Sequence, residues 1–207
     1  MAKVYLARHG ETTWNLAGRY QGRRESALSA LGVRQAIALA GAFTPERSIE
    51  RVVSSPLLRC AATAKFVADA LDLEVETDER LIEIAHGTWE GRLRDEIAAN
   101  DPERYRAWRK DPARVAFEGG ETLAGVQARW REFAERFDAS RETLVVTHDA
   151  VVRVALLAQT GGSLDDFWKM PVENAAYAVF DGAFRLVEPC VNAHLDSLRA
   201  DVNDQAL

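Results

Sequence analysis

The sequence predicts an α/β fold, a three-layer α/β/α sandwich with helices on both faces of a mostly parallel sheet. Short apolar runs, which are typical of buried strands, alternate along the chain with longer segments of helical periodicity. The chain has 207 residues, of which 47% are hydrophobic and 28% charged, the size and composition of one globular domain. We therefore expect a single domain over residues 1–207.

The first part of the chain predicts three strands and two helices. Ser29 is suited to cap the first helix. Ser55-Pro56 combines a capping serine with a proline that fits the first helical turn, so the second helix is expected to begin there. The strands are expected at 4–7, 51–54 and 73–77, and the helices at 29–43 and 55–71.

Residues 84–122 are less regular and predict a cover over an active site. Pro102 and Pro112 separate short helical pieces at 93–99 and 102–109, and Gly119-Gly120 interrupts the chain again. An irregular segment of this length inside a compact domain is more often functional than a plain connection.

The last part of the chain predicts two helices, a strand and a hairpin. Leu123, Val126 and Trp130 fall on one face of a helix over 122–137. No element is predicted after Pro189, where Leu195, Leu198 and Val202 would pack on the body of the protein or on a partner chain, which would give a homodimer. The other elements are a strand at 143–147, a helix at 150–159 and a hairpin of strands at 175–180 and 184–187, joined at Asp181-Gly182.

Composition limits the partners and the compartment. The formal net charge of −6 argues against nucleic acid or an anionic membrane as the main partner. Cys60 and Cys190 are too few for a disulfide framework or a metal site. The chain enters its first strand without a signal segment, and no apolar run approaches the roughly 20 residues of a membrane span. We therefore expect a cytoplasmic protein without a membrane partner.

Five polar residues predict a phosphoryl-binding site. Arg8-His9 follows the first strand, Arg59 comes shortly after the second, and His148 follows the fourth. Because the carboxyl ends of parallel strands share one edge of a sheet, these side chains can converge there. An imidazole can attack phosphorus while guanidinium groups hold its oxygens. Glu83, between two isoleucines, has the apolar surroundings that raise a carboxyl pKa, as a general acid near neutral pH requires.

Short motifs follow one another along the chain in a fixed order. They are Arg8-His9-Gly10-Glu11-Thr12 with Trp14-Asn15, Gln21-Gly22 with Leu28-Ser29, Ser54-Ser55-Pro56-Leu57-Leu58-Arg59, Leu81-Ile82-Glu83-Ile84 with Gly87-Thr88-Trp89-Glu90-Gly91, and Gly119-Gly120-Glu121-Thr122 with Val145-Val146-Thr147-His148. This set resembles the histidine phosphatase superfamily, the phosphoglycerate-mutase-like group, from residue 4 to about residue 180. The resemblance implies the fold of that group.

The resemblance also implies a role for each matched residue, and it implies no metal or other cofactor. His9 would be the nucleophile that carries the phosphoryl group as phosphohistidine. Glu83 would protonate the leaving oxygen and later activate a water, although Glu90 and Glu121 are acids in related segments. The phosphate oxygens would be held by Arg8, Arg59 and His148, with Asn15, Gln21 and Gly22 adding contacts.

The pattern favours a phosphatase over a mutase. The stretch from Glu83 to His148 is compact, whereas the mutase branch carries a longer insertion there. Arg109 and Lys110 instead resemble the basic pair with which mutases bind anionic substrate groups; they would bind a carboxylate or second phosphate, or form a solvated pair. We expect a phosphatase acting on a small metabolite such as a phosphoglycerate or sugar phosphate. The alternatives are a phosphoglycerate mutase and a catalytically idle protein that binds phosphorylated ligands.

Single residues carry two further predictions. Asp149 stands where many relatives have glycine, and a carboxylate there would repel phosphate unless it is turned away or paired. Arg153, one helical turn further on, is suited to pair with it. His86 and His194 are interpreted as ordinary surface or loop residues.

Overall fold

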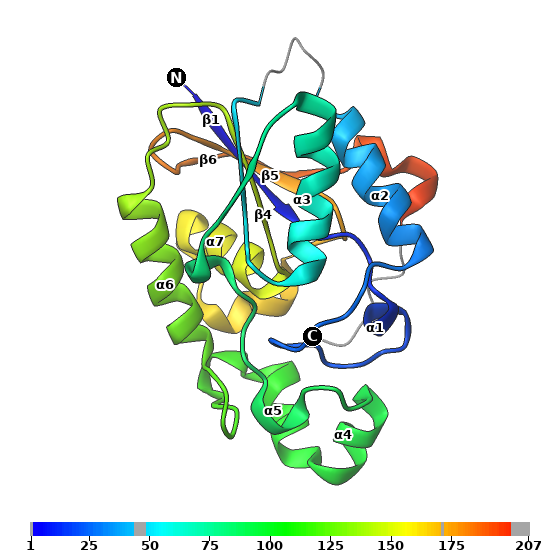
Figure 1. Ribbon diagram of the computed structural model, residues 1–207. Coiled ribbons are helices and arrows are strands. Elements are labelled where there is room, and N and C mark those ends of the chain that lie inside the picture. Colours follow the sequence, from blue (N-terminus) through cyan, green and yellow to red (C-terminus); the bar gives the residue numbers. More distant parts are fainter. Residues whose placement is uncertain (1, 44–48, 171, 200–207) are drawn as a thin grey trace.

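The sheet is mostly parallel, as predicted. Within the residues that the structure describes, 2–43, 49–170 and 172–199 of a computed structural model, six strands form one sheet (Figure 1). The first four strands run parallel to one another, and the last two are antiparallel to their neighbours. The strands are β1 (Lys3–Arg8), β2 (Arg51–Ser54), β3 (Val75–Thr77), β4 (Thr143–Thr147), β5 (Tyr177–Asp181) and β6 (Leu186–Val191), in the order β3-β2-β4-β1-β5-β6.

Helices cover both faces of this sheet, which confirms the predicted three-layer arrangement. Successive residues of β1 are buried in two different clusters, because side chains alternate across a strand. Val4 and Leu6 belong to one cluster, and Tyr5 and Ala7 to the other. The first cluster includes residues of α6 (Leu123–Arg136) and α7 (Asp149–Thr160), and the second includes residues of α2 (Ala30–Gly41) and α3 (Leu58–Leu71), the two helix pairs that lie on opposite sides of the sheet in Figure 1.

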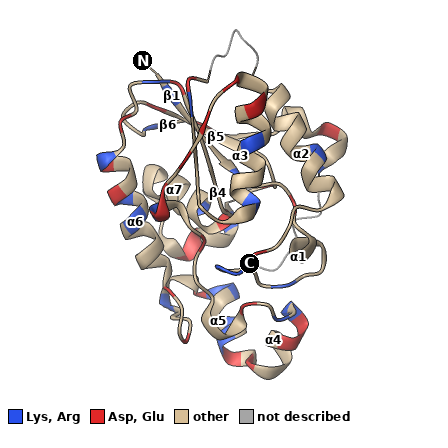
Figure 2. Ribbon diagram, viewed as in Figure 1, with Lys and Arg blue, Asp and Glu red and all other residues tan. Residues whose placement is uncertain are grey.

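The carboxyl ends of β1, β2 and β4 meet at one edge of the sheet because these strands are parallel. The β1 arrow in Figure 1 points toward this edge. Three short helices lie beyond it: α1 (Thr13–Leu16), α4 (Arg94–Asn100) and α5 (Pro102–Lys110). The last two correspond to the helical pieces predicted at 93–99 and 102–109. In Figure 2, acidic and basic residues are interspersed over α4, α5 and α6. None of the helices in the described part of the chain has the length and apolarity that a bilayer crossing requires.

The helix α3 begins later than predicted, because Ser55 is used elsewhere. The N-cap is Leu57, whose side chain makes no capping bond. The Ser55 hydroxyl instead accepts a hydrogen bond from Leu57 N at 3.3 Å and contacts His148 Nε2 at 2.8 Å. The amide of Leu58, the first helical residue, donates to the Glu25 carboxylate at 2.9 Å. A side chain from a distant loop therefore satisfies the start of this helix.

The C-terminal part extends further in regular structure than the sequence predicts. The strand β6 passes through Pro189, which an edge strand tolerates because its outer amides need no partner. A 3-10 helix (Ala193–Leu198) follows, with Leu195 buried and the Leu198 carbonyl accepting from Gln35 Nε2 at 2.8 Å. The tail thus packs on the body of the protein as far as it is described. Val202, which was predicted to pack with it, lies outside the described residues.

His86 lies in a loop, one of the two positions predicted for it, but it is buried and not on the surface. Its side chain is 2% exposed and packs edge-on against the rings of Tyr20 and Phe117, with centroid distances of 5.0 and 4.7 Å. Neither ring nitrogen has a hydrogen-bond partner in the described part of the chain, and burial lowers the pKa of His86 to about 3. Trp89 and Trp108 pack against Phe117 and are buried in the same core cluster as residues of α6 and α7, so the irregular segment is continuous with the main core.

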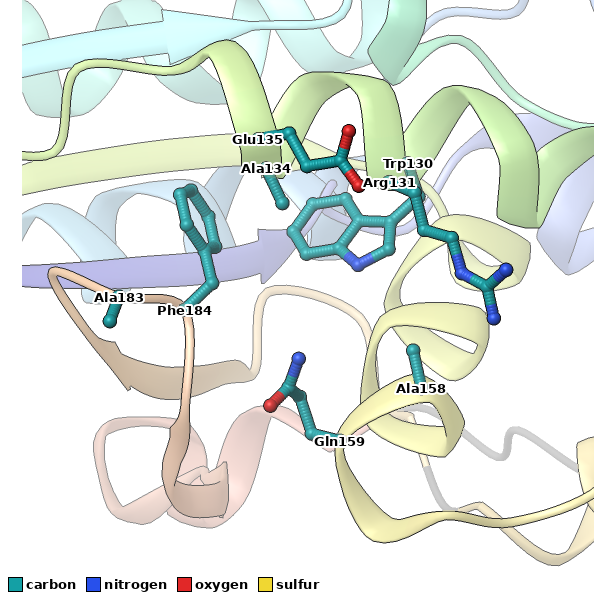
Figure 3. A pocket seen from close by; sticks show the side chains of 8 residues that line it. All are labelled: Trp130, Arg131, Ala134, Glu135, Ala158, Gln159, Ala183 and Phe184. Carbon is teal, nitrogen blue, oxygen red and sulfur yellow. The ribbon is translucent and has the colours of Figure 1, made fainter.

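A surface hollow of about 310 Å³ lies between α6, α7 and the turn that joins β5 to β6. Figure 3 shows Trp130, Gln159 and Phe184 among the side chains that line it. Asp181, at the end of β5 just before this turn, lies opposite Lys3, at the start of β1, in the antiparallel strand register. The hollow is therefore at the amino end of β1, away from the strand ends that carry the predicted site.

Candidate active site

His9 lies directly after β1 and is held by main-chain bonds on both sides. Its amide donates to the Thr147 carbonyl at 2.9 Å, and its carbonyl accepts from Asn174 Nδ2 at 3.2 Å. The ring Nδ1 lies 2.7 Å from the Gly10 carbonyl oxygen. Because a carbonyl can only accept, Nδ1 carries the proton and Nε2 keeps its lone pair. The imidazole is thus held in the tautomer that a nucleophile requires.

His148 is the N-cap residue of α7 and stands against His9, with the two ring centroids 5.3 Å apart. Its Nε2 lies 2.8 Å from Ser55 Oγ. That hydroxyl also accepts from Leu57 N, and it can exchange one further hydrogen bond with the His148 ring. Ser55 is not among the site residues predicted from the sequence. Its position directly after β2 is the signal that could have indicated it.

Two buried guanidinium groups lie near these histidines. Arg59, in the first turn of α3, is 1% exposed and donates to the carbonyls of Gly22 at 2.7 Å and Arg24 at 3.0 Å. Its Nε makes no hydrogen bond within the described residues. Arg8, also 1% exposed, donates to the Val172 carbonyl at 2.9 Å. Carbonyl oxygens orient a guanidinium without cancelling its charge, so this arrangement is suited to bind an anion.

Both histidines have lowered pKa values. Burial lowers the pKa of His9, and the charges of Arg59 and Arg8 lower it further. Burial is also the main cause of the lowered pKa of His148, followed by the charges of Arg59 and His9. The arginine charges predict this direction for His9 from sequence, whereas burial is the larger cause in the structure. Both imidazoles are therefore neutral near neutral pH, and His9 retains a lone pair for attack.

Glu83 has the environment that the sequence predicts for a general acid. Its side chain is 4% exposed, and one carboxylate oxygen accepts from Ile84 N at 2.9 Å. Burial raises the pKa of Glu83 to about 7, against the opposing charge of Arg59. The two alternative acids have other partners: Glu90 accepts from His86 N at 3.0 Å, and Glu121 pairs with Arg129 at 3.0 Å. Glu83 is thus an acid whose protonation changes near pH 7.

Asn15 and Gln21 are buried and come together through Thr12. The Thr12 hydroxyl lies 3.0 Å from Asn15 Oδ1 and 2.9 Å from Gln21 Oε1. These contacts use the amide oxygens, and Asn15 Nδ2 is buried without a hydrogen bond in the described residues. Gly22 has a φ of +52°, and an added Cβ would lie 2.1 Å from a Glu90 oxygen, so glycine is required there.

The pairing predicted for Asp149 is present. Arg153 Nε lies 2.5 Å from one Asp149 oxygen, and the other oxygen lies 3.4 Å from Arg8 Nη1. The Asp149 side chain is fully buried. Its charge is therefore compensated between two guanidinium groups, one of which belongs to the site.

Arg109 and Lys110 are exposed, unlike the buried side chains of His9, Arg59 and Glu83. Both end α5 with exposed side chains, and the Arg109 guanidinium lies 4.1 Å from the centre of the Trp168 ring. Arg23, which is not among the residues predicted from the sequence, donates from Nε to the Glu83 carbonyl at 3.3 Å and borders a hollow of about 450 Å³. Its place directly after Gln21-Gly22 is the signal that could have indicated it.

The arrangement is suited to transfer a phosphoryl group. A neutral imidazole with a free lone pair, two fixed guanidinium groups and a carboxyl that titrates near pH 7 supply a nucleophile, charge stabilisation and a proton donor. In the described part of the chain, no group of three or more His, Cys, Asp or Glu side chains is placed to hold a metal ion.

Comparisons with known proteins agree with this geometry. A family model described as the histidine phosphatase superfamily (branch 1) matches residues 4–184. Phosphoserine phosphatase 1 of Hydrogenobacter thermophilus is 40% identical over 182 residues, which cover 86% of each chain. The solved structure of Bacillus stearothermophilus YhfR matches 94% of this chain and 100% of its own with a TM-score of 0.84 and 29% identity. A mycobacterial glucosyl-3-phosphoglycerate phosphatase in complex with VO3 matches 87% of this chain and 93% of its own, with a TM-score of 0.79 and 30% identity.

Proposed function

From the premise that the chain belongs to the histidine phosphatase superfamily, branch 1, we propose that it is a metal-independent phosphomonoesterase acting on a small phosphorylated metabolite. The observation that carries this proposal is the convergence of His9, Arg8, Arg59, His148 and Glu83 in one buried site. The relatives support the substrate class, because phosphoserine and glucosyl-3-phosphoglycerate are small phosphorylated metabolites that carry a carboxylate.

In the first step, His9 Nε2 attacks phosphorus in line with the ester oxygen. The new N–P bond forms as the P–O bond to the leaving group breaks, and the protonated Glu83 carboxyl gives its proton to the departing oxygen. Arg8 and Arg59 neutralise the charge on the three equatorial oxygens, and the His148 ring, Asn15 Nδ2 and the Gln21 amide donate hydrogen bonds to them. The product of this step is phosphohistidine at His9 together with a free alcohol.

In the second step, a water molecule replaces the alcohol. The Glu83 carboxylate accepts a proton from the water as its oxygen attacks phosphorus and the N–P bond breaks. Inorganic phosphate leaves, and both His9 and Glu83 return to their starting states. The segment 84–122 would exclude other water from this reaction, and Arg109 and Lys110 would contact an anionic group of the substrate at its rim; both roles remain predictions.

The experiment that tests this function measures phosphate release in the presence of EDTA. The panel contains phosphoserine, 2- and 3-phosphoglycerate and several sugar phosphates, and mutase products are assayed in the same tubes. Release that EDTA leaves unchanged and that depends on His9 supports a metal-independent phosphatase. Interconversion of the phosphoglycerates with little release would support the mutase instead, and binding without turnover would support an idle phospho-ligand binder.

Replacement of Arg59 by lysine is expected to lower kcat/KM by about 10²–10³-fold. Lysine keeps the charge but loses the planar group that bonds two carbonyls, Gly22 and Arg24, at once. The matched control is Arg51→Lys, because Arg51 also makes two bonds, to the exposed Glu76, but lies outside the site. Steady-state kinetics on the preferred substrate check this, and equal losses in both variants would contradict it.

A further inference from the structure

Arg8 belongs to an array of three buried charges, of which the catalytic steps do not use the other two, Asp149 and Arg153. The side chains of Arg8, Asp149 and Arg153 are 1%, 0% and 8% exposed. Asp149 lies between the two arginines, with one oxygen 2.5 Å from Arg153 Nε and the other 3.4 Å from Arg8 Nη1. Together the three groups carry one net positive charge.

Asp149 acts on Arg8 through its charge rather than by holding it in place. The oxygen that faces Arg8 makes no hydrogen bond within the described residues. Arg8 Nη1 donates instead to the Val172 carbonyl at 2.9 Å, which fixes the guanidinium independently of Asp149. Burial lowers the pKa of Arg8, the charge of Asp149 raises it, and the charge of Arg153 lowers it. Arg8 is thus subject to both neighbouring charges.

Arg153 also has anchors of its own. Its Nη1 donates to the carbonyls of Phe167, at 3.1 Å, and Met170. The guanidinium lies 5.3 Å from the centre of the Phe167 ring and 5.4 Å from that of Trp168. Neutralising Asp149 would therefore leave Arg153 near Arg8, which would raise the positive charge of the array.

We propose that Asp149 and Arg153 set the positive charge at the Arg8 side of the phosphate site and so determine how tightly the site holds phosphate. This inference rests on the proposed function, in which Arg8 contacts the transferred group. Two uncompensated buried cations would bind the phosphate product tightly and slow its release. Asp149 offsets one of them, and Arg153 limits the extent to which Asp149 neutralises Arg8. Both residues act through the charge at Arg8 and do not touch the substrate.

The test is the affinity for inorganic phosphate, measured by titration calorimetry on the whole chain. Asp149→Asn removes the negative charge and is expected to tighten binding by about tenfold, whereas Arg153→Met leaves Asp149 opposite Arg8 alone and weakens it by about tenfold. The double variant keeps the charge of Arg8 alone, so its affinity returns toward that of the wild type. A purely structural role predicts instead that all three variants bind phosphate more weakly, and that result would overturn the inference.

Two comparisons make the outcome decisive. Asp69→Asn is the matched control, because Asp69 pairs with Lys65 at 2.7 Å over the same helical spacing but on the surface; its phosphate affinity should not change. If Asp149→Asn fails to fold, the double variant still decides, because it leaves no unpaired carboxylate or arginine at this pair. Weak binding by the folded double variant would overturn the inference while wild-type turnover leaves the proposed function in place. A wild-type protein that binds no phosphate would also overturn the inference, whereas a wild-type protein that turns over no substrate would overturn the proposed function as well.

Discussion

Replacement of His9 by alanine is expected to abolish phosphate release, lowering kcat by at least about 10⁴-fold. The described part of the site offers no substitute nucleophile. His148 Nε2 is occupied by Ser55 Oγ at 2.8 Å, and burial raises the pKa of the Cys60 thiol, so that it stays protonated. Single-turnover assays measure the loss directly.

Trapping of the phosphoenzyme tests the same residue by its chemistry. Wild-type enzyme quenched in alkali after mixing with labelled substrate should carry an acid-labile, alkali-stable phosphoryl group, and His9→Ala should carry none. His194→Gln is the control for loss of a histidine, because His194 is half-buried, contacts the Ala175 carbonyl at 2.9 Å and has no role in the proposed reaction. Label retained in His9→Ala would assign the nucleophile to another residue.

The fold was predictable because its signals are local and periodic. The strand at 143–147 is observed with those bounds, and β1, β2 and α7 lie within one residue of the predicted ranges at each end. The start of α3 was not predictable, since it depends on Glu25 from a distant loop and on the use of Ser55 by His148. The burial of His86 was missed for a related reason: it depends on contacts with Tyr20 and Phe117, which lie far from it in the sequence.

The site divides in the same way between local and distant contacts. The Asp149–Arg153 pair spans one helical turn, so residue spacing alone predicts it. The approach of Asp149 to Arg8 joins residues that are far apart in the sequence, so residue spacing does not predict it. Ser55 and Arg23 were missed because each acts on a predicted residue through a single hydrogen bond, to a ring nitrogen in one case and a main-chain carbonyl in the other.

Replacement of Glu83 by glutamine is expected to slow hydrolysis of alkyl phosphates by about 10²–10⁴-fold, because the leaving oxygen loses its proton donor. p-Nitrophenyl phosphate needs no proton on its leaving group, so the first step should remain fast with that substrate. The second step still needs the Glu83 carboxylate as a base. Stopped-flow measurements on Glu83→Gln should therefore show a burst of one nitrophenolate per site followed by slow turnover. Equal slowing of the burst for both substrate types would contradict the role of Glu83 as acid.

The pH dependence gives an independent test of the same carboxyl. Because burial raises the pKa of Glu83 to about 7, wild-type kcat/KM for an alkyl phosphate should fall as the pH rises through that value. This alkaline limb should be absent in Glu83→Gln. It should persist in Glu132→Gln, a matched change at an exposed acid that pairs with Arg136 at 3.0 Å.

The contribution of Glu83 to the free energy of unfolding should change with pH in the direction opposite to that of a salt-bridged acid. Below the pKa of Glu83 in the unfolded chain, both states hold the proton, and burial of this side chain carries no ionisation cost. As the pH rises toward the folded-state pKa of about 7, the unfolded state loses its proton first and the free energy of unfolding falls; above that value the full cost is present. Glu83→Gln should therefore melt near the wild-type temperature at pH 4 and above it at pH 8. Equal melting temperatures at pH 8 would mean that Glu83 ionises normally in the folded protein, and it could not then serve as the proton donor at neutral pH.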